Sequence, residues 1–255
     1  MGPITLLTAC MLSISSAPSI DLPVEFSTDD GFTLYLPEGW VEIPSHVLDQ
    51  YSQTMHELAP EIPARKYDYG YQPQPDVPGT WLIHPYVIVQ IKRVGRLPEN
   101  EMRNHKWLDK QIEREKEQVE QKMSKVITVC EPGETVYEPR HRILWMRSTL
   151  DARNSGRITY LTAMRLTNFG FIQLNMYSTA QTFDDYEPVY KQIATSMALD
   201  SEIEYQPKFT DNFPLFGSRS SWRSLKIAIR YVAFAAIALL FLYVMERIKK
   251  ASRRT

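Results

Sequence analysis

The chain has few of the residues from which recognisable catalytic and metal-binding motifs are built. Its two cysteines, Cys10 and Cys130, form no metal or redox motif, and Cys10 lies in a segment that signal cleavage can remove, so no structural disulfide is expected. The ten glycines are spread through turns, and none belongs to a GxxxxGK, GxGxxG or GxSxG motif. The sequence therefore lacks a phosphate-binding loop and a serine-hydrolase elbow.

Histidine is also sparse, with five residues scattered along the chain. The run His56-Glu57-Leu58-Ala59-Pro60 fails the zinc-binding HExxH pattern, because the second histidine is missing and proline breaks the helix. The acidic pairs Asp29-Asp30 and Asp184-Asp185 open a turn and begin a helix, respectively. These features predict no metal site, no cofactor and no catalytic residue, although distant residues that converge in the fold can still build an enzyme site.

Charge is distributed unevenly, although the formal net charge is only -1. Residues 219–255 hold nine of the 29 basic residues and one acidic residue, Glu246, so residues 1–218 hold 20 basic and 29 acidic residues. An acidic body does not attract nucleic acid, since phosphate neutralisation needs a basic face. The basic residues instead flank an apolar segment, where anionic lipid head groups are their natural partner.

That apolar segment predicts a single membrane-spanning helix. Residues 225–246 have the length of about 20 residues that crosses a bilayer. Between residues 227 and 244 there is one charged residue, Arg230, which lies near the start of the segment, where its long side chain can reach the head groups. A buried core helix is the alternative, but basic clusters at both ends and the lack of a polar face favour the membrane. The anchor residues singled out are Ile227, Arg230, Tyr231, Phe234, Leu239, Leu240 and Tyr243.

The two ends of the chain together predict its orientation. Residues 1–20 have an apolar centre followed by small residues, typical of a signal sequence, but no Lys or Arg precedes that centre. Cys10 also ends a short lipobox-like run, and an uncleaved apolar tail is a further alternative. With a signal sequence, the basic tail over residues 247–255 stays in the cytoplasm and the globular domain lies outside. Without one, the chain would be a cytosolic domain on a tail anchor.

Residues 22–205 predict one globular α+β domain, joined to the membrane segment by a linker over residues 206–224. Two strand-like runs meet at Asp29-Asp30-Gly31, which predicts a hairpin because Asp-Gly supplies the positive φ of a tight turn. Trp40, where the chain returns to extended structure, is expected to be buried. Ser45 is expected to be the N-cap of a helix, because apolar residues follow it at steps of three and four.

The second half of the domain predicts a β-rich arrangement. A β-branched strand over residues 82–94 precedes an amphipathic helix over residues 100–126. After Pro132-Gly133, consecutive strands with short turns predict an antiparallel meander. Thr182, with Asp185 three residues later, predicts a capping box for the last helix. This order implies an antiparallel sheet covered by helices in an α/β/α layered domain.

Three alternating tyrosines, Tyr67, Tyr69 and Tyr71, would place their rings on one face of a strand. Such a face predicts either a stacking platform for a sugar or peptide or half-buried strand packing. The packing interpretation is favoured, because aromatic residues are common on half-buried strands.

The run from Phe32 to Trp40 resembles the opening strand-Pro-x-Gly-Trp signature of PsbP-like domains, and the strand from Phe171 and helix around Tyr190 are similar to the closing elements of that family. The resemblance covers residues 23–200 in element order. It implies a non-enzymatic, extracytoplasmic accessory protein that binds a larger membrane complex. The predicted membrane helix departs from the soluble photosynthetic members, so no photosystem role is carried over.

These observations together predict a membrane-tethered, non-catalytic binding or accessory domain. Its expected partners are the lipid bilayer and a larger membrane protein complex, with no nucleic acid. The alternatives are a hydrolase-like enzyme whose site is assembled from dispersed residues and the tail-anchored cytosolic interaction domain.

Overall fold

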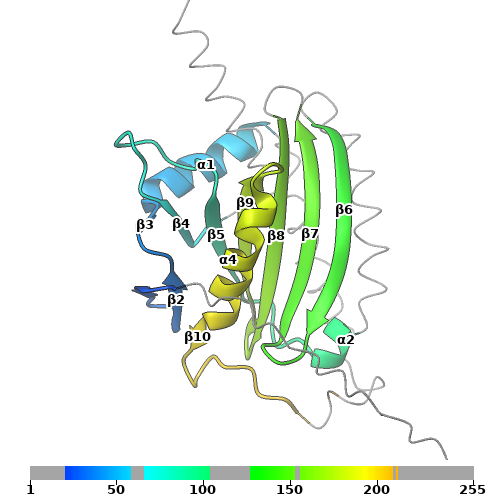
Figure 1. Cartoon of the computed structure of the whole chain (residues 1–255). Coiled ribbons are helices and arrows are strands. Elements are labelled where there is room, and N and C mark those ends of the chain that lie inside the picture. The colour runs from blue at the N-terminus through cyan, green and yellow to red at the C-terminus, as the bar shows by residue number, and fades with distance from the viewer. Residues whose placement is uncertain (1–20, 59–65, 104–126, 153–155, 209–210, 212–255) are drawn as a thin grey trace, which may run out of the picture.

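The computed structural model describes residues 21–58, 66–103, 127–152, 156–208 and 211. These residues form a mixed α/β fold dominated by a seven-stranded antiparallel sheet in the order β3-β4-β5-β9-β8-β7-β6 (Figure 1). The strands are β3 (Trp40–Glu42), β4 (Tyr69–Pro73), β5 (Tyr86–Lys92), β6 (Ile127–Glu138), β7 (Ile143–Ala152), β8 (Gly156–Thr167) and β9 (Gly170–Thr179).

The main hydrophobic core lies on one face of this sheet. The face is covered by helix α4 (Phe183–Ser196) and by a small sheet of β1 (Val24–Ser27), β2 (Phe32–Leu36) and β10 (Ala198–Leu199). Buried side chains from several elements meet there, among them Leu34, Val87, Leu174 and Ile193. Helix α4 lies over β8 and β9, whereas β7 and β6 extend past its edge (Figure 1).

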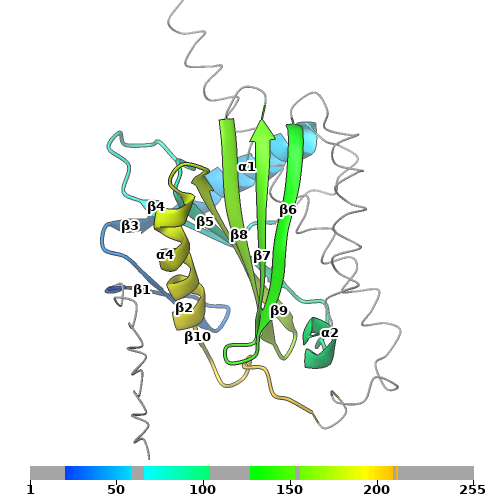
Figure 2. The ribbon, with the colours of Figure 1, turned by 45° about the vertical axis from the view of Figure 1, so that its right-hand side comes forward.

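Helix α1 (Ser45–Leu58) packs on the opposite face, beside β4, and the two views together place α1 and α4 on opposite sides of the sheet (Figures 1 and 2). Gly70 of β4 permits this close packing, because a Cβ there would lie 3.0 Å from Leu48 and 3.2 Å from Ile43. A short helix, α2 (Glu99–Arg103), contributes Met102 to a second buried cluster on the β7–β8 part of the sheet.

Several elements agree with the sequence-based predictions. β1 and β2 pair as an antiparallel hairpin, and Gly31 in the connecting turn has a φ of +81°. The predicted helix from Ser45 is α1, and β6 to β9 form the predicted antiparallel meander. Trp40 is 6% exposed, as expected from its place between strand and helix.

Other local predictions were wrong. The opening strands do not form one sheet with the rest, because β1 and β2 pair with β10 while β3 joins the edge of the large sheet. Pro132-Gly133 does not precede the strand but interrupts the register inside β6. Thr182 makes no capping hydrogen bond, because its φ of -106° and ψ of -2° are helical instead of extended; its hydroxyl lies 2.9 Å from that of Thr179.

The folded body also extends past its predicted end at residue 205. The backbone N–H of Gln206 donates to Asn168 at 3.1 Å, and Asp211, 5% exposed, pairs with Arg96. At least the first residues of the predicted linker therefore belong to the domain.

Several predictions fall outside the residues that the structure describes. They are the signal segment over residues 1–20, most of the helix predicted over residues 100–126, the membrane span over residues 225–246 and the basic tail that follows it. Among the described residues, no helix combines the length and the apolar character needed to cross a bilayer. The anchor residues from Ile227 to Tyr243 stay a prediction from sequence.

Candidate functional site

A groove runs beside α4, over the part of the core face that this helix leaves uncovered. Its volume is about 420 Å³, within the range of roughly 300–1,000 Å³ common for ligand sites. Nine side chains line it: Glu134, Val136 and Glu138 from β6, Trp145 and Arg147 from β7, Leu161 from β8, and Glu187, Lys191 and Thr195 from α4. The groove thus joins three neighbouring strands to one helix.

The groove follows from the alternation of side chains on the strands and from the period of the helix. Val136 pairs with Trp145 and Arg147 pairs with Leu161 in the sheet register, so these side chains emerge on the same face. On α4, the lining residues recur every fourth position, which places them along one side of the helix. The buried residues of α4, such as Ile193, point into the core instead.

The floor of the groove is apolar and firmly held. Leu161 is 3% exposed and Trp145 is 8% exposed, whereas Val136 on the β6 side is 43% exposed. The Trp145 indole N–H donates to Glu138 Oε2 at 3.0 Å, which orients the ring. The floor therefore offers a rigid aromatic and aliphatic surface with an exposed apolar rim.

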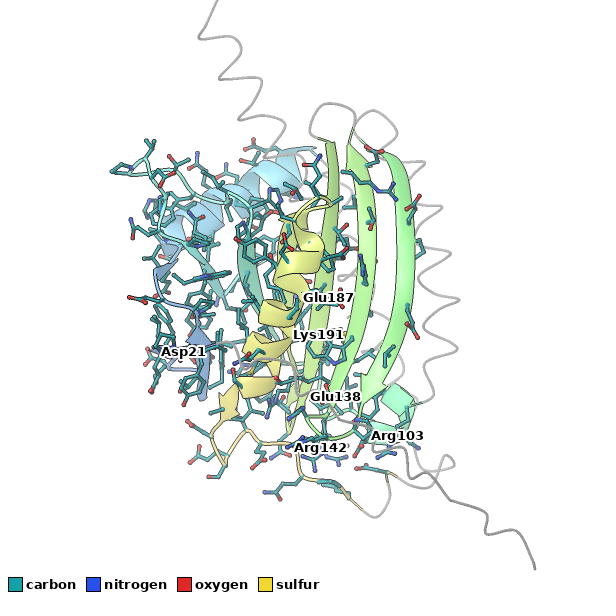
Figure 3. The ribbon with its side chains drawn as sticks, in the orientation of Figure 1. Asp21, Arg103, Glu138, Arg142, Glu187 and Lys191 are labelled. Atoms are coloured by element: carbon teal, nitrogen blue, oxygen red, sulfur yellow. The ribbon has the colours of Figure 1, made fainter. Side chains whose placement is uncertain are left out.

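On the α4 side, the charges neutralise one another. Arg147 donates to Glu187 Oε2 at 3.2 Å and lies within 3.4 Å of Asp184, and Lys191 pairs with the other Glu187 oxygen at 2.7 Å. The Arg147 guanidinium also lies 4.5 Å from the centre of the Phe183 ring. Figure 3 shows Glu187 and Lys191 projecting from α4, above Glu138. Each exposed ion pair of this kind stabilises the fold by at most about 1 kcal/mol, so the network mainly positions side chains.

The β6 side carries two carboxylates that form no ion pair with a described Lys or Arg, although Arg165 interacts electrostatically with Glu138. Glu138 contacts Trp145 through one oxygen and His141 Nδ1, at 2.5 Å, through the other. Within the described part of the chain, no hydrogen bond or ion pair reaches the Glu134 carboxylate, and no Lys or Arg lies within ion-pair distance of Glu138. The two carboxylates flank Val136 on the same face of β6.

Tyr67, Tyr69 and Tyr71 do not form a shared surface, and their burial agrees with the favoured packing interpretation instead of a stacking platform. Tyr67 precedes β4 and is 4% exposed, with its ring 5.0 Å from that of Tyr51 on α1. Tyr71 is 1% exposed and packs against Phe26 of β1 on the other face of the sheet. The rings are split between the two faces because Tyr67 lies outside the strand, so its side chain does not follow the alternation of β4.

Tyr69 is the most accessible of the three and is also engaged. Its hydroxyl donates to Asp30 Oδ2 at 2.8 Å, and its ring meets Phe32 edge-on at 5.6 Å. Burial, together with the hydrogen bond to Asp30, raises the pKa of Tyr69 to about 12. Its hydroxyl therefore stays a hydrogen-bond donor at neutral pH.

Comparisons with known proteins show a distant similarity in fold. No family model matches the chain, and no curated protein matches it. Among solved structures, the fold is similar to the solution structure of cyanobacterial PsbP (CyanoP) from Synechocystis sp. PCC 6803, with 10% identity and a TM-score of 0.39 over 73% of this chain and 98% of that chain. This is a distant PsbP-like likeness in fold, and it carries no argument about function.

The groove residues were not identified from the sequence, because β6, β7 and α4 come together only in the fold. The one local signal was the alternation Glu134-x-Val136-x-Glu138, in which the two glutamates flank the strand expected over residues 135–137. Among the described residues, no group of three His, Cys, Asp or Glu side chains is placed to hold a metal ion. Within the described part of the chain, the groove is the candidate site, and its chemistry is that of a charged rim above an apolar floor.

Proposed function

We propose that this chain is a membrane-tethered, non-catalytic domain that binds an extended segment of a partner protein in the groove beside α4. The observation that carries the proposal is the apolar floor of Trp145 and Leu161 between two charged walls. Binding sites commonly combine a rigid apolar surface with a few polar groups that orient the ligand.

The dimensions of the groove suit a short piece of extended chain. Glu187 to Thr195 cover about 12 Å along α4 at roughly 1.5 Å per residue. Glu134 to Glu138 cover about 13 Å along β6 at roughly 3.3 Å per residue. An extended peptide of about five residues has the same length.

A hydrolase is the main alternative, and the contact between His141 and Glu138 is the observation in its favour. The other lining groups argue against it. Glu187 has both oxygens in ion pairs, and the Thr195 hydroxyl donates to the Lys191 carbonyl of its own helix at 2.9 Å. The lining contains no serine or cysteine, so a nucleophile paired with a base is missing from it.

The membrane tether rests on the sequence of residues 225–246 and on the basic residues that flank them. A larger membrane protein complex is the natural source of a partner, because the tether confines the domain to the membrane surface. The signal-like N-terminus supports a position outside the cytoplasm; a tail-anchored cytosolic domain would present the same groove on the other side of the bilayer.

Site-specific photocrosslinking in native membranes tests this proposal. A photoreactive residue at Val136, in the groove, is compared with one at Val77, which is 65% exposed and outside the groove lining. We expect one membrane-complex subunit to crosslink from position 136 and not from position 77. The purified subunit should bind the full-length chain, and Thr195→Trp, which fills the groove, should weaken that binding. Equal adducts from both positions, or none, would contradict the proposal.

A further inference from the structure

The two walls of the groove differ in what they offer a ligand. The cations on the α4 side, Arg147 and Lys191, are already paired with Glu187 and Asp184. The β6 side presents Glu134 and Glu138, which have no Lys or Arg partner among the described residues. Among the described residues, the groove carboxylates that no Lys or Arg pairs with therefore lie on β6, where Glu138 also contacts His141 and Trp145.

The spacing of these two carboxylates is set by the strand. Both lie on the groove face of β6, four residues apart, which corresponds to about 13 Å along the strand. Val136, 43% exposed, lies midway between them, and Trp145 lies beside it on β7. Along this edge of the groove, an apolar side chain, Val136, therefore lies between two acidic ones, Glu134 and Glu138, at intervals of two residues.

We propose that the occupant is an extended partner segment with two basic side chains four residues apart and an apolar side chain midway between them. This inference rests on the proposed function and specifies its ligand. An extended segment repeats its side chains on one face every second residue, so its two cations meet Glu134 and Glu138 while its central apolar side chain covers Val136 and Trp145.

The same charges exclude other classes of ligand. A nucleic acid strand or an anionic lipid surface would bring phosphates against the two carboxylates, and like charges at such a contact are repelled. An acidic peptide would meet the same repulsion. A basic segment gains instead from steering by the acidic rim.

A fluorescence-anisotropy titration of the full-length chain in detergent micelles tests the inference. The probes are labelled peptides with the core Lys-Ser-Leu-Ser-Lys, its Gln-Ser-Leu-Ser-Gln and Glu-Ser-Leu-Ser-Glu counterparts, and Ser-Lys-Leu-Lys-Ser, in which the lysines are two residues apart. We expect the first peptide to bind most tightly and the glutamate peptide most weakly. Raising the salt concentration should weaken the binding of the lysine peptide and leave the binding of the glutamine peptide unchanged.

The variant Glu134→Gln/Glu138→Gln keeps the shape of both side chains and an acceptor for the Trp145 indole. It should weaken the binding of the Lys-Ser-Leu-Ser-Lys peptide about tenfold, which is the combined effect of two exposed charge contacts. The binding of the glutamine peptide should be unaffected. Glu131→Gln is the matched control, because Glu131 lies on the same strand, pairs with Arg157 and is not part of the groove lining. Thermal unfolding of each variant shows that the fold is retained.

Equal binding of the lysine, glutamine and glutamate peptides would overturn the inference that the ligand is basic, but would leave the groove as a binding site. Equal binding of the two lysine spacings would overturn the proposed spacing. If no peptide binds but the crosslink from Val136 still forms in membranes, the ligand assignment is wrong and the proposed function stands. If neither binding nor crosslink is found, both are wrong.

Discussion

Arg96 and Asp211 form a buried ion pair that joins the segment after β10 to the loop between β5 and α2. Arg96 Nη1 donates to Asp211 Oδ1 at 2.8 Å, and Nη2 contacts the other carboxylate oxygen. The Tyr205 hydroxyl and the Lys208 backbone N–H donate to the same carboxylate at 3.0 and 2.8 Å. Burial of this carboxyl raises its pKa, but the bonds from Arg96, Lys208 and Tyr205 outweigh burial and hold the pKa of Asp211 below its ordinary value.

Replacing Asp211 should destabilise the fold, because it leaves a mostly buried guanidinium without its counter-charge. We expect Asp211→Ala to lower the free energy of unfolding by about 3 kcal/mol, measured by chemical denaturation of the full-length chain in detergent. Glu202→Ala, an exposed acidic residue of the same segment, should change it by at most about 0.5 kcal/mol. Similar effects of the two substitutions would show that the ion pair does not hold the segment.

Stability should fall on acidification because of His84. Burial lowers the pKa of His84 to about 4, below its ordinary value of 6.5. The folded state therefore prefers the neutral imidazole, so the contribution of His84 is complete above about pH 6.5 and is lost as the pH falls towards about 4. His84→Gln should remove roughly 2–3 kcal/mol of this pH dependence. The free energy of unfolding of the unchanged chain and of the His84→Gln variant is measured between about pH 7 and pH 4. An equal dependence on pH in the two proteins would contradict this account.

Trp40 joins the start of β3 to the main core, where it is 6% exposed and belongs to the cluster that includes Leu36 and Phe183. Trp40→Ala should therefore cost about 3–5 kcal/mol of unfolding free energy, since it leaves a large cavity. Trp40→Phe, which keeps most of the ring volume, should cost less. Equal, small shifts of the melting temperature for both variants would show that the ring contributes little to the core.

Gly170 allows β5 and β9 to approach each other. A Cβ at Gly170 would lie 2.0 Å from the Lys92 carbonyl oxygen, whereas a Cβ at Gly79 meets nothing within 4 Å; both glycines have positive φ. Gly79→Ala should thus cost only backbone strain, about 1 kcal/mol. Gly170→Ala must also separate two paired strands, and we expect it to cost more than about 3 kcal/mol or to prevent folding. Equal losses would show that the close approach is relaxed easily.

The parts of the fold that depend on neighbouring residues were predictable from the sequence. Asp29-Asp30-Gly31 contains its own turn geometry, and α1 follows from apolar steps of three and four after Ser45. The meander β6 to β9 follows from strands separated by short turns. In each case the determining residues are adjacent in the chain, so their pattern is visible in one sequence.

The features that depend on long-range contacts were not predictable. The pairing of β2 with β10 and the ion pair between Arg96 and Asp211 join residues far apart in the chain, and no local pattern marks them. The groove is a further example, because Glu138, Trp145 and Glu187 meet only after α4 folds back onto the sheet. The expectation that Tyr67 would share one face with Tyr69 and Tyr71 was wrong for a related reason: alternation applies only inside a strand, and Tyr67 precedes β4.

The central claim is that this domain is held at the membrane with its groove outside the cytoplasm. Protease accessibility tests it most directly, using intact cells, cells with an opened outer envelope, and an epitope tag after Thr255. Our account predicts digestion of the body and survival of a tagged fragment that contains residues 225–255. It also predicts that neutral replacements of Arg247, Lys249, Lys250, Arg253 and Arg254 give mixed orientations without loss of insertion, because apolar length drives insertion and charge selects its direction. A protected body with an accessible tag would place the domain in the cytosol, and release of the whole chain without detergent would show that it has no membrane anchor.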